Sequence, residues 1–170
     1  MKTTPDYQFL TKFIVASTLS FFIGSVHGVL QVLPSIRAWL DSIGSPYGGP
    51  GHMIDPLAHA HINLIGGVTM AIIAVSYYML QKISNKPLYS IKLANFSFWA
   101  TMIGILSFYS TLVIFGIWEG NLLLAESPDL EEVHATATIF IATTATIMGI
   151  GLWSYMLTVM LTVIKNKKEQ

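Results

Sequence analysis

The chain has 170 residues, of which 53% are hydrophobic and only 11% are charged, and its formal net charge at pH 7 is zero. This composition excludes a disordered chain and an ordinary water-soluble domain, whose helices need charged faces. Cysteine is absent, which excludes disulfides, thiolate metal ligands, iron–sulfur clusters and covalently attached haem. Nothing in the charge balance indicates a nucleic-acid partner.

Long uncharged segments dominate the sequence. Asp, Glu, Lys and Arg are missing from four of them: 13–36, 56–81, 93–118 and 133–164. Each is longer than the roughly 20 apolar residues that cross a bilayer core. We therefore predict an all-α integral membrane protein with the lipid bilayer as its surroundings, folded as a four-helix bundle. We expect a single transmembrane domain over residues 1–170, with helices at about 8–38, 56–83, 90–119 and 131–165.

Turn-forming residues mark the ends of these helices. Pro34 indicates a kink or the approach to the end of the first helix, and Gly and Pro are dense in the outer loop at 45–51. Asp55 and Pro56 suit the first turn of the second helix, because proline needs no hydrogen-bond acceptor there and the carboxylate favours the positive end of the helix dipole. A short polar loop at 126–129 precedes the fourth helix.

Basic residues predict the orientation. Eight of the nine lie on the side of the amino terminus, the 82–92 loop and the carboxyl tail, and only Arg37 lies on the other side. By the positive-inside rule both termini are cytoplasmic. We therefore expect a multi-pass protein of the cell's inner (cytoplasmic) membrane.

All five histidines fall towards the outer face of this topology, at His27, His52, His59, His61 and His134. Ionisable residues inside membrane spans are costly, so such a group is a candidate functional site. A rise of about 1.5 Å per residue puts His27 and His61 at the most similar depth. His59 and His134 are shallower and form a possible second level.

Imidazole is the natural protein ligand for haem iron in a chain without cysteine. Helix bundles commonly place such ligands on facing helices. Small residues follow the faces of His27 and His134, where they either leave room for a flat ring or allow close helix packing. Arg37, the only outer cation, is the candidate partner for a haem propionate. We predict one or two haem b groups, bound by His27, His59, His61 and His134.

Three further features have alternative interpretations. His59 and His61 point about 200° apart around a helix, so the pair suits a helix between two sites, or one ligand and one hydrogen-bonding residue. His52 and Met53 are compatible with a copper or zinc contact or with a plain polar loop. Glu119 is a candidate proton-relay carboxylate or an interfacial residue.

The chain resembles the large catalytic subunit of haem-copper oxidases, especially the cbb-type oxidases and the related nitric oxide reductases. The resemblance rests on Ala58-His59-Ala60-His61 with Gly66, Leu88-Tyr89-Ser90, Phe98-Trp99, Ile103-Gly104-Ile105, and Gly116-Ile117 with Gly120. In order and spacing these are similar to the family's tenth and eleventh helices and the segment that joins them.

The resemblance implies roles for the His-x-His pair. It assigns His59 to a high-spin active-site haem and His61 to a low-spin haem b. The family's second low-spin ligand comes from an early helix that has no counterpart here, so His27 or His134 would replace it. This chain has too few helices for a whole catalytic subunit, lacks counterparts of the histidines that bind copper, and has Glu119 where the family has Gln.

The leading hypothesis is a small membrane b-type cytochrome with haem near the outer face, ligated by His61 and His27. His59 and His134 are a second pair or a supporting shell. Such a protein transfers electrons in a respiratory chain, with quinol or a cytochrome as redox partner, as a homo-oligomer or a subunit of a larger oxidase or reductase complex. Whether the chain is itself an enzyme stays open.

Three alternatives remain. A five-coordinate haem would bind NO or O2 instead of only transferring electrons. A membrane accessory protein would bind copper or zinc through His52, Met53, His59 and His134. In a structural subunit the histidines would only satisfy one another.

Overall fold

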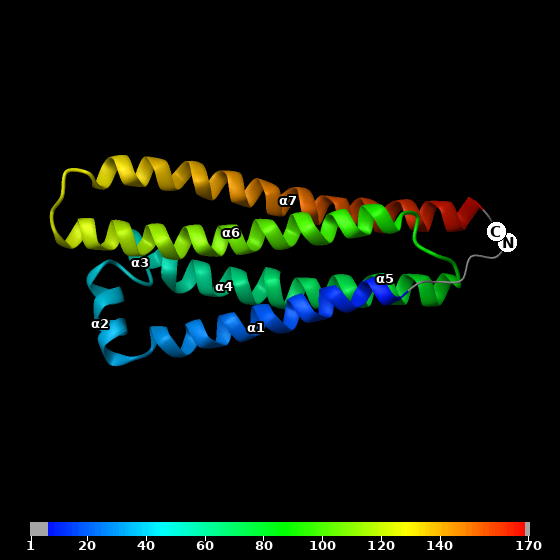
Figure 1. The fold of residues 1–170 in the computed structure, drawn as a ribbon, viewed down its shortest axis with the longest axis horizontal. Coiled ribbons are helices and arrows are strands. Elements are labelled where there is room, and N and C mark those ends of the chain that lie inside the picture. Colours follow the sequence, from blue (N-terminus) through cyan, green and yellow to red (C-terminus); the bar gives the residue numbers. More distant parts are fainter. Residues whose placement is uncertain (1–6, 169–170) are drawn as a thin grey trace.

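The computed structural model describes residues 7–168. Over that range the chain is helical and contains no strand, and its long helices run side by side along one axis (Figure 1). Four segments are long and apolar enough to cross a membrane: Gln8–Gln31, Gly49–Ser84, Ile91–Leu124 and Leu130–Lys165. The predictions of an all-helical chain and of four candidate spans are confirmed.

The first span ends earlier than the sequence predicts. A 3-10 turn, η1 (Gln8–Leu10), leads into α1 (Thr11–Gln31). A separate helix, α2 (Pro34–Ser42), then lies across the end of the bundle (Figure 1). Leu33 is extended, with φ −61° and ψ 132°, because the residue before a proline avoids the helical region and Pro34 is suited to a first turn.

The second span is a chain of helical pieces that begins at Gly49, ahead of the expected start. In order they are α3 (Gly49–His52), the π-helical η2 (Met53–Ala58), α4 (His59–His61), the π-helical η3 (Ile62–Thr69) and α5 (Met70–Ser84). Asp55 interrupts the helical backbone with φ −130° and ψ 113°. π-Helical turns are rare in proteins, but those that occur are often found at functional sites. Here they lie on both sides of α4, which contains His59 and His61.

The third and fourth spans form one long antiparallel hairpin. Ser90 caps α6 (Ile91–Leu124) by accepting a hydrogen bond from the backbone N–H of Leu93, and α7 (Leu130–Lys168) follows a short loop. The two helices approach closely at Gly104, where a Cβ would collide with the backbone of Met148. Small residues at such crossings let membrane helices pack through their backbones.

An aromatic cluster fills the half of the bundle that contains the lysines. The ring centroids of Phe13 and Phe98 lie 4.9 Å apart, and those of Phe13 and Tyr77 lie 5.9 Å apart. This cluster joins α1, α5 and α6 and contains none of the histidines.

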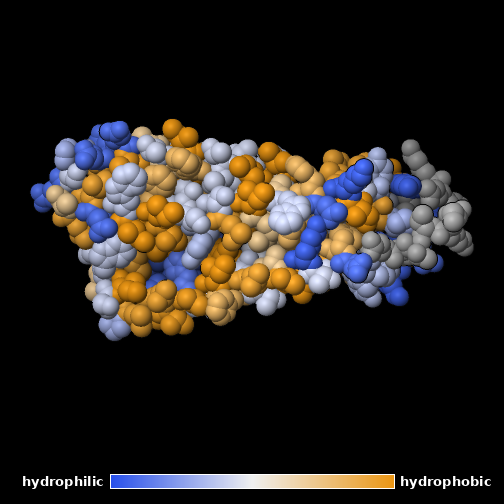
Figure 2. Space-filling model, viewed as in Figure 1, coloured by the Kyte–Doolittle hydropathy of each residue, from blue (hydrophilic) through white to orange (hydrophobic). Residues whose placement is uncertain are grey.

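The surface over these helices is largely apolar, with hydrophilic side chains gathered towards both ends (Figure 2), as a membrane-spanning bundle requires.

Candidate functional site

A network around Arg37 closes the end of the bundle opposite the chain termini. Arg37 donates from Nε and Nη2 to Asp41 Oδ1 at 2.9 and 2.6 Å, and from Nη1 to Asp55 Oδ2 at 2.5 Å. Nη2 also donates to Ser45 Oγ at 2.7 Å. Hydrogen bonds to Asp41, and next to Asp55, raise the pKa of Arg37 above its usual range. The guanidinium that the sequence suggests for a propionate is thus occupied by two carboxylates, of which Asp41 lies on α2 itself and Asp55 ties α2 to η2.

The small-residue face of α1 is filled by the second span. A Cβ on Gly28 would lie 2.9 Å from His59 Cε1, and a Cβ on Gly24 would collide with the side chain of Asn63. Ser17 Oγ donates to the carbonyl of Gly67 at 2.8 Å. Of the two interpretations of this face, close helix packing therefore describes the contacts that α1 makes here.

His27, His59 and Tyr109 form a partly buried polar cluster. His27 is 8% exposed, and its Nδ1 lies 3.1 Å from Tyr109 Oη. Its ring meets that of His59 edge to face, with centroids 5.5 Å apart. The Nδ1 atom of His59 is buried without a hydrogen-bond partner. Buried polar atoms are rarely left unpaired, so this cluster is a candidate site.

An apolar cavity of about 600 Å³ lies beside this cluster, between α1, α2 and α6. Its polar lining comes from His27, Gln31, Tyr109 and Asn121, and Gln31 Oε1 is buried without a partner. Figure 2 shows hydrophilic side chains recessed among apolar ones over this part of α1 and α6. The volume is within the range of small-molecule pockets.

His61 lies apart from that cluster and has a defined orientation. Its Nδ1 is 2.9 Å from the carbonyl oxygen of Leu57, and its ring centroid is 4.9 Å from that of Phe108. A carbonyl only accepts, so Nδ1 carries the proton and Nε2 keeps a lone pair in the neutral ring. This is the arrangement in which a second hydrogen bond fixes a metal-binding histidine.

Glu119 and His134 form a third polar group, between α6 and α7. Glu119 is 2% exposed, and its Oε2 accepts from His134 Nδ1 at 2.9 Å. The other oxygen, Oε1, is buried without a partner. Both residues line a pocket of about 530 Å³, together with Met53. The antiparallel hairpin brings them together although 15 positions separate them in the sequence.

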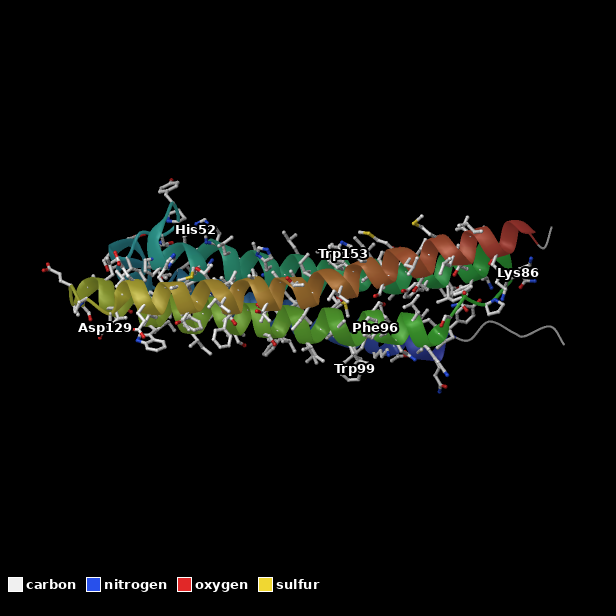
Figure 3. All side chains as sticks on the ribbon, turned by 90° about the horizontal axis from the view of Figure 1, so that it is seen from above. His52, Lys86, Phe96, Trp99, Asp129 and Trp153 are labelled. Carbon is white, nitrogen blue, oxygen red and sulfur yellow. The ribbon has the colours of Figure 1, made fainter. Side chains whose placement is uncertain are left out.

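His52 takes a separate position, at the end of α3. Its Nδ1 donates to the carbonyl of Pro46 at 2.5 Å. Figure 3 places it on the opposite side of the molecule from Phe96 and Trp99. His52 and Met53 are neighbours in sequence, but only Met53 lines the pocket of Glu119 and His134.

The family described as cytochrome C and quinol oxidase polypeptide I matches residues 1–132, well over half of the chain. The chain belongs to this family. The match includes the His-x-His segment and also α1, which lies outside the Ala58–Gly120 resemblance. No curated protein and no solved structure matches the chain. The resemblance to the haem-copper oxidase catalytic subunit is thus confirmed, and members of this family bind haem and copper in general.

Since members of this family bind haem, a histidine of this chain fits that role only if it has a nitrogen free to bind iron. Over residues 7–168, no group of three or more His, Asp and Glu side chains converges as a metal ion requires. His27 contacts His59, whereas His61 contacts Leu57 and Phe108. The donor chemistry of His61 fits haem iron, because its Nε2 is available and Phe108 gives it an apolar neighbour. In the described part of the chain, His61 Nε2 is thus a nitrogen that would hold haem iron.

Sequence reasoning missed several polar residues of these sites. Gln31, Asn63, Tyr109 and Asn121 all surround the His27 cluster or its cavity. Each could have been recognised as a candidate in the sequence, because each is a polar side chain within or next to an apolar span. Asp41 also carried a signal, because it lies four residues after Arg37 on one helix.

Proposed function

We propose that this chain is a haem b-binding subunit of a membrane oxidase or reductase complex, and that it carries electrons near the outer face. The observation that supports this most is the anchoring of His61 Nδ1 by the Leu57 carbonyl, 2.9 Å away, in a member of a haem-binding family. The anchored ring would present Nε2, which carries no proton in this tautomer, to the haem iron.

His61 would hold the iron, and Leu57 would fix the ring. Phe108 packs on the imidazole and would keep water from the axial bond. When bound, the haem would supply a one-electron carrier. A second axial imidazole would come from a second copy of the chain or from another subunit, since His27 is engaged with His59 and Tyr109.

His27 and His59 would serve a second site. A second haem would use one of them as its ligand and the other as a hydrogen-bonding residue beside the 600 Å³ cavity. His134 stays a further candidate ligand, because Glu119 fixes its Nδ1. The redox partner would be quinol or a cytochrome.

The distribution of lysines supports the orientation that we propose. Lys82, Lys86 and Lys92 flank the turn between α5 and α6, at the end of the bundle where α1 begins and α7 ends (Figure 1). This end would face the cytoplasm. The histidines would then lie towards the outside of the inner membrane, within one transmembrane domain.

Copper or zinc binding is the second candidate function, favoured by the pocket that Met53, Glu119 and His134 line. Thioether, carboxylate and imidazole together suit copper, and Glu119 Oε1 is unpaired. His59 and His52 point to other partners, so this site would need a further donor. A five-coordinate haem on His61 that binds NO or O2 is the corresponding alternative for iron.

Purification from native membranes together with bound partners tests the proposal. A reduced minus oxidised spectrum should show haem b bands, and haem analysis should give one or two haems per chain, or one per pair of chains. A preparation that retains its partners but contains no haem would overturn the proposal. Copper or zinc in that haem-free preparation would support the second candidate.

A further inference from the structure

A second hollow lies between α1 and α6, at the end of the bundle that carries the lysines. Its volume is about 630 Å³. Polar and aromatic side chains line the part around Lys12, namely Gln8, Thr11, Phe9, Phe98 and Trp99, and Met102 and aliphatic side chains line the rest. The cavity beside His27 lies between the same two helices, further towards the outer end. The hollow is therefore separate from the candidate haem ligands.

Lys12 is a cation with neutral surroundings. Its ammonium donates to Asn95 Oδ1 and lies 4.6 Å from the ring centroid of Phe98 and 5.9 Å from that of Trp99. In the part of the chain that the structure describes, no carboxylate forms an ion pair with it. Rings and an amide stabilise an ammonium without cancelling its charge. An anion would find an uncompensated positive group here.

The hollow continues from Lys12 as an apolar slot. Val15 and Leu19 line it from α1, and Met102, Ile103 and Leu106 line it from α6. Seven residues separate Lys12 from Leu19, so the slot runs for about 10 Å along the helix. A ligand that matches it has an anionic head beside the lysine and an apolar tail.

A second lysine adds to the positive charge at this end. Lys92 is exposed and precedes Asn95 by three positions and Trp99 by seven, so all three share one face of α6. Trp99 is 59% exposed, and Figure 3 shows it projecting from α6 away from α7. Lys12 lies beside Trp99, and lysine and tryptophan at one level are typical of the membrane interface, where phospholipid headgroups lie.

We propose that this groove binds an anionic phospholipid, with its phosphate at Lys12 and an acyl chain in the slot between α1 and α6. Basic pockets between membrane helices attract anionic headgroups in this way. The site does not depend on haem or on the histidines. A neutral amphiphile would fit the slot but would gain nothing from the lysine.

Lipid selectivity of the full chain tests whether Lys12 binds an anionic headgroup. The protein is reconstituted in vesicles of equal phosphatidylglycerol and phosphatidylcholine, and the retained lipid is measured by native mass spectrometry. We expect the wild type to retain phosphatidylglycerol about tenfold more than phosphatidylcholine, a preference of roughly 1.4 kcal/mol. Lys12→Gln should lose this preference and Lys12→Arg should keep it. Lys82→Gln, at the same end but outside the groove, should leave it unchanged.

Two matched tryptophan substitutions on α1 test the acyl-chain part. Val15 and Ile14 are 50% and 47% exposed, but only Val15 lines the slot. Val15→Trp should reduce the retained phosphatidylglycerol severalfold, and Ile14→Trp should not. Equal retention of both lipids by the wild type, or an unchanged preference in Lys12→Gln, would overturn the proposal. Equal effects of Val15→Trp and Ile14→Trp would overturn the placement of the chain in the slot.

Discussion

The imidazoles of His27 and His59 meet edge to face, with ring centroids 5.5 Å apart and an interplanar angle of 76°. Rings in direct contact leave no gap for a porphyrin between them. His61, two residues further, packs instead on Phe108. His59 and His61 thus lie on two sides of one helix, and each contacts a different aromatic ring.

The crossing of α6 and α7 predicts a position-specific effect of alanine. Gly104→Ala places a methyl group against the backbone of Met148, which should lower the free energy of unfolding by about 1–3 kcal/mol. Gly149→Ala is the control, because a Cβ there meets only Trp153, at 3.8 Å or more. Thermal unfolding in detergent measures both variants. Equal midpoints would show that the crossing does not exclude a side chain.

The guanidinium of Arg37 should stabilise the end of the bundle where α2 meets η2. Arg37→Gln leaves Asp55, whose side chain is 13% exposed, without its charged donor, and should cost about 1.5–3 kcal/mol. Arg37→Lys keeps the charge but loses the fork, so it should recover only part of this stability. Asp41→Asn should cost less than about 1 kcal/mol, since Asp41 is 57% exposed. Unfolding of the three variants measures the ranking, and a larger loss for Asp41→Asn would contradict it.

The same group sets a pH dependence. The folded pKa of Arg37 is raised by Asp41 and Asp55, so its stabilising effect is complete below the unfolded pKa and is lost only above the raised value. The difference in stability between wild type and Arg37→Gln that arises from arginine ionisation should therefore stay constant from about pH 6 to pH 9. Unfolding of both proteins across this range checks the prediction. A difference that falls steadily with rising pH would contradict it.

Glu119 and His134 should be energetically coupled. His134→Ala removes the only described partner of a carboxyl group that is 2% exposed, and should cost about 1–3 kcal/mol. In a Glu119→Gln background the same change should cost less. A double-mutant cycle on unfolding should give a coupling energy of about 0.5–3 kcal/mol. A coupling energy near zero would mean that the contact does not stabilise the fold.

The spans were predictable because charge is excluded from a bilayer core over a fixed length. The interruptions were harder to place. Of the two predictions for Pro34, the approach to the end of the first helix is confirmed, but the new helix that Pro34 starts after the extended Leu33 was not predicted. The π-helical turns beside His59 and His61 left no clear sign in the residue pattern, because they depend on backbone hydrogen bonds.

The sequence indicated which polar residues to consider together, but not which of them contact one another. The sequence correctly separated His59 from His61, since an angle of about 200° follows from the helix alone. The contact between Glu119 and His134 depends on how α6 and α7 pair. Depth also does not determine rotation, so similar depths for His27 and His61 did not decide which neighbours each ring contacts. Their joint ligation of one iron stays a prediction.

The central claim is that His61 Nε2 is an axial ligand of haem b. The most direct measurement is the reduced minus oxidised spectrum of His61→Ala, purified from native membranes with its partners, beside that of His52→Ala. His52→Ala is the matched control, because the His52 ring is also anchored through Nδ1 by a carbonyl, that of Pro46. We predict that His61→Ala loses haem b bands while His52→Ala retains them. Full haem b bands in a folded His61→Ala protein would contradict the account.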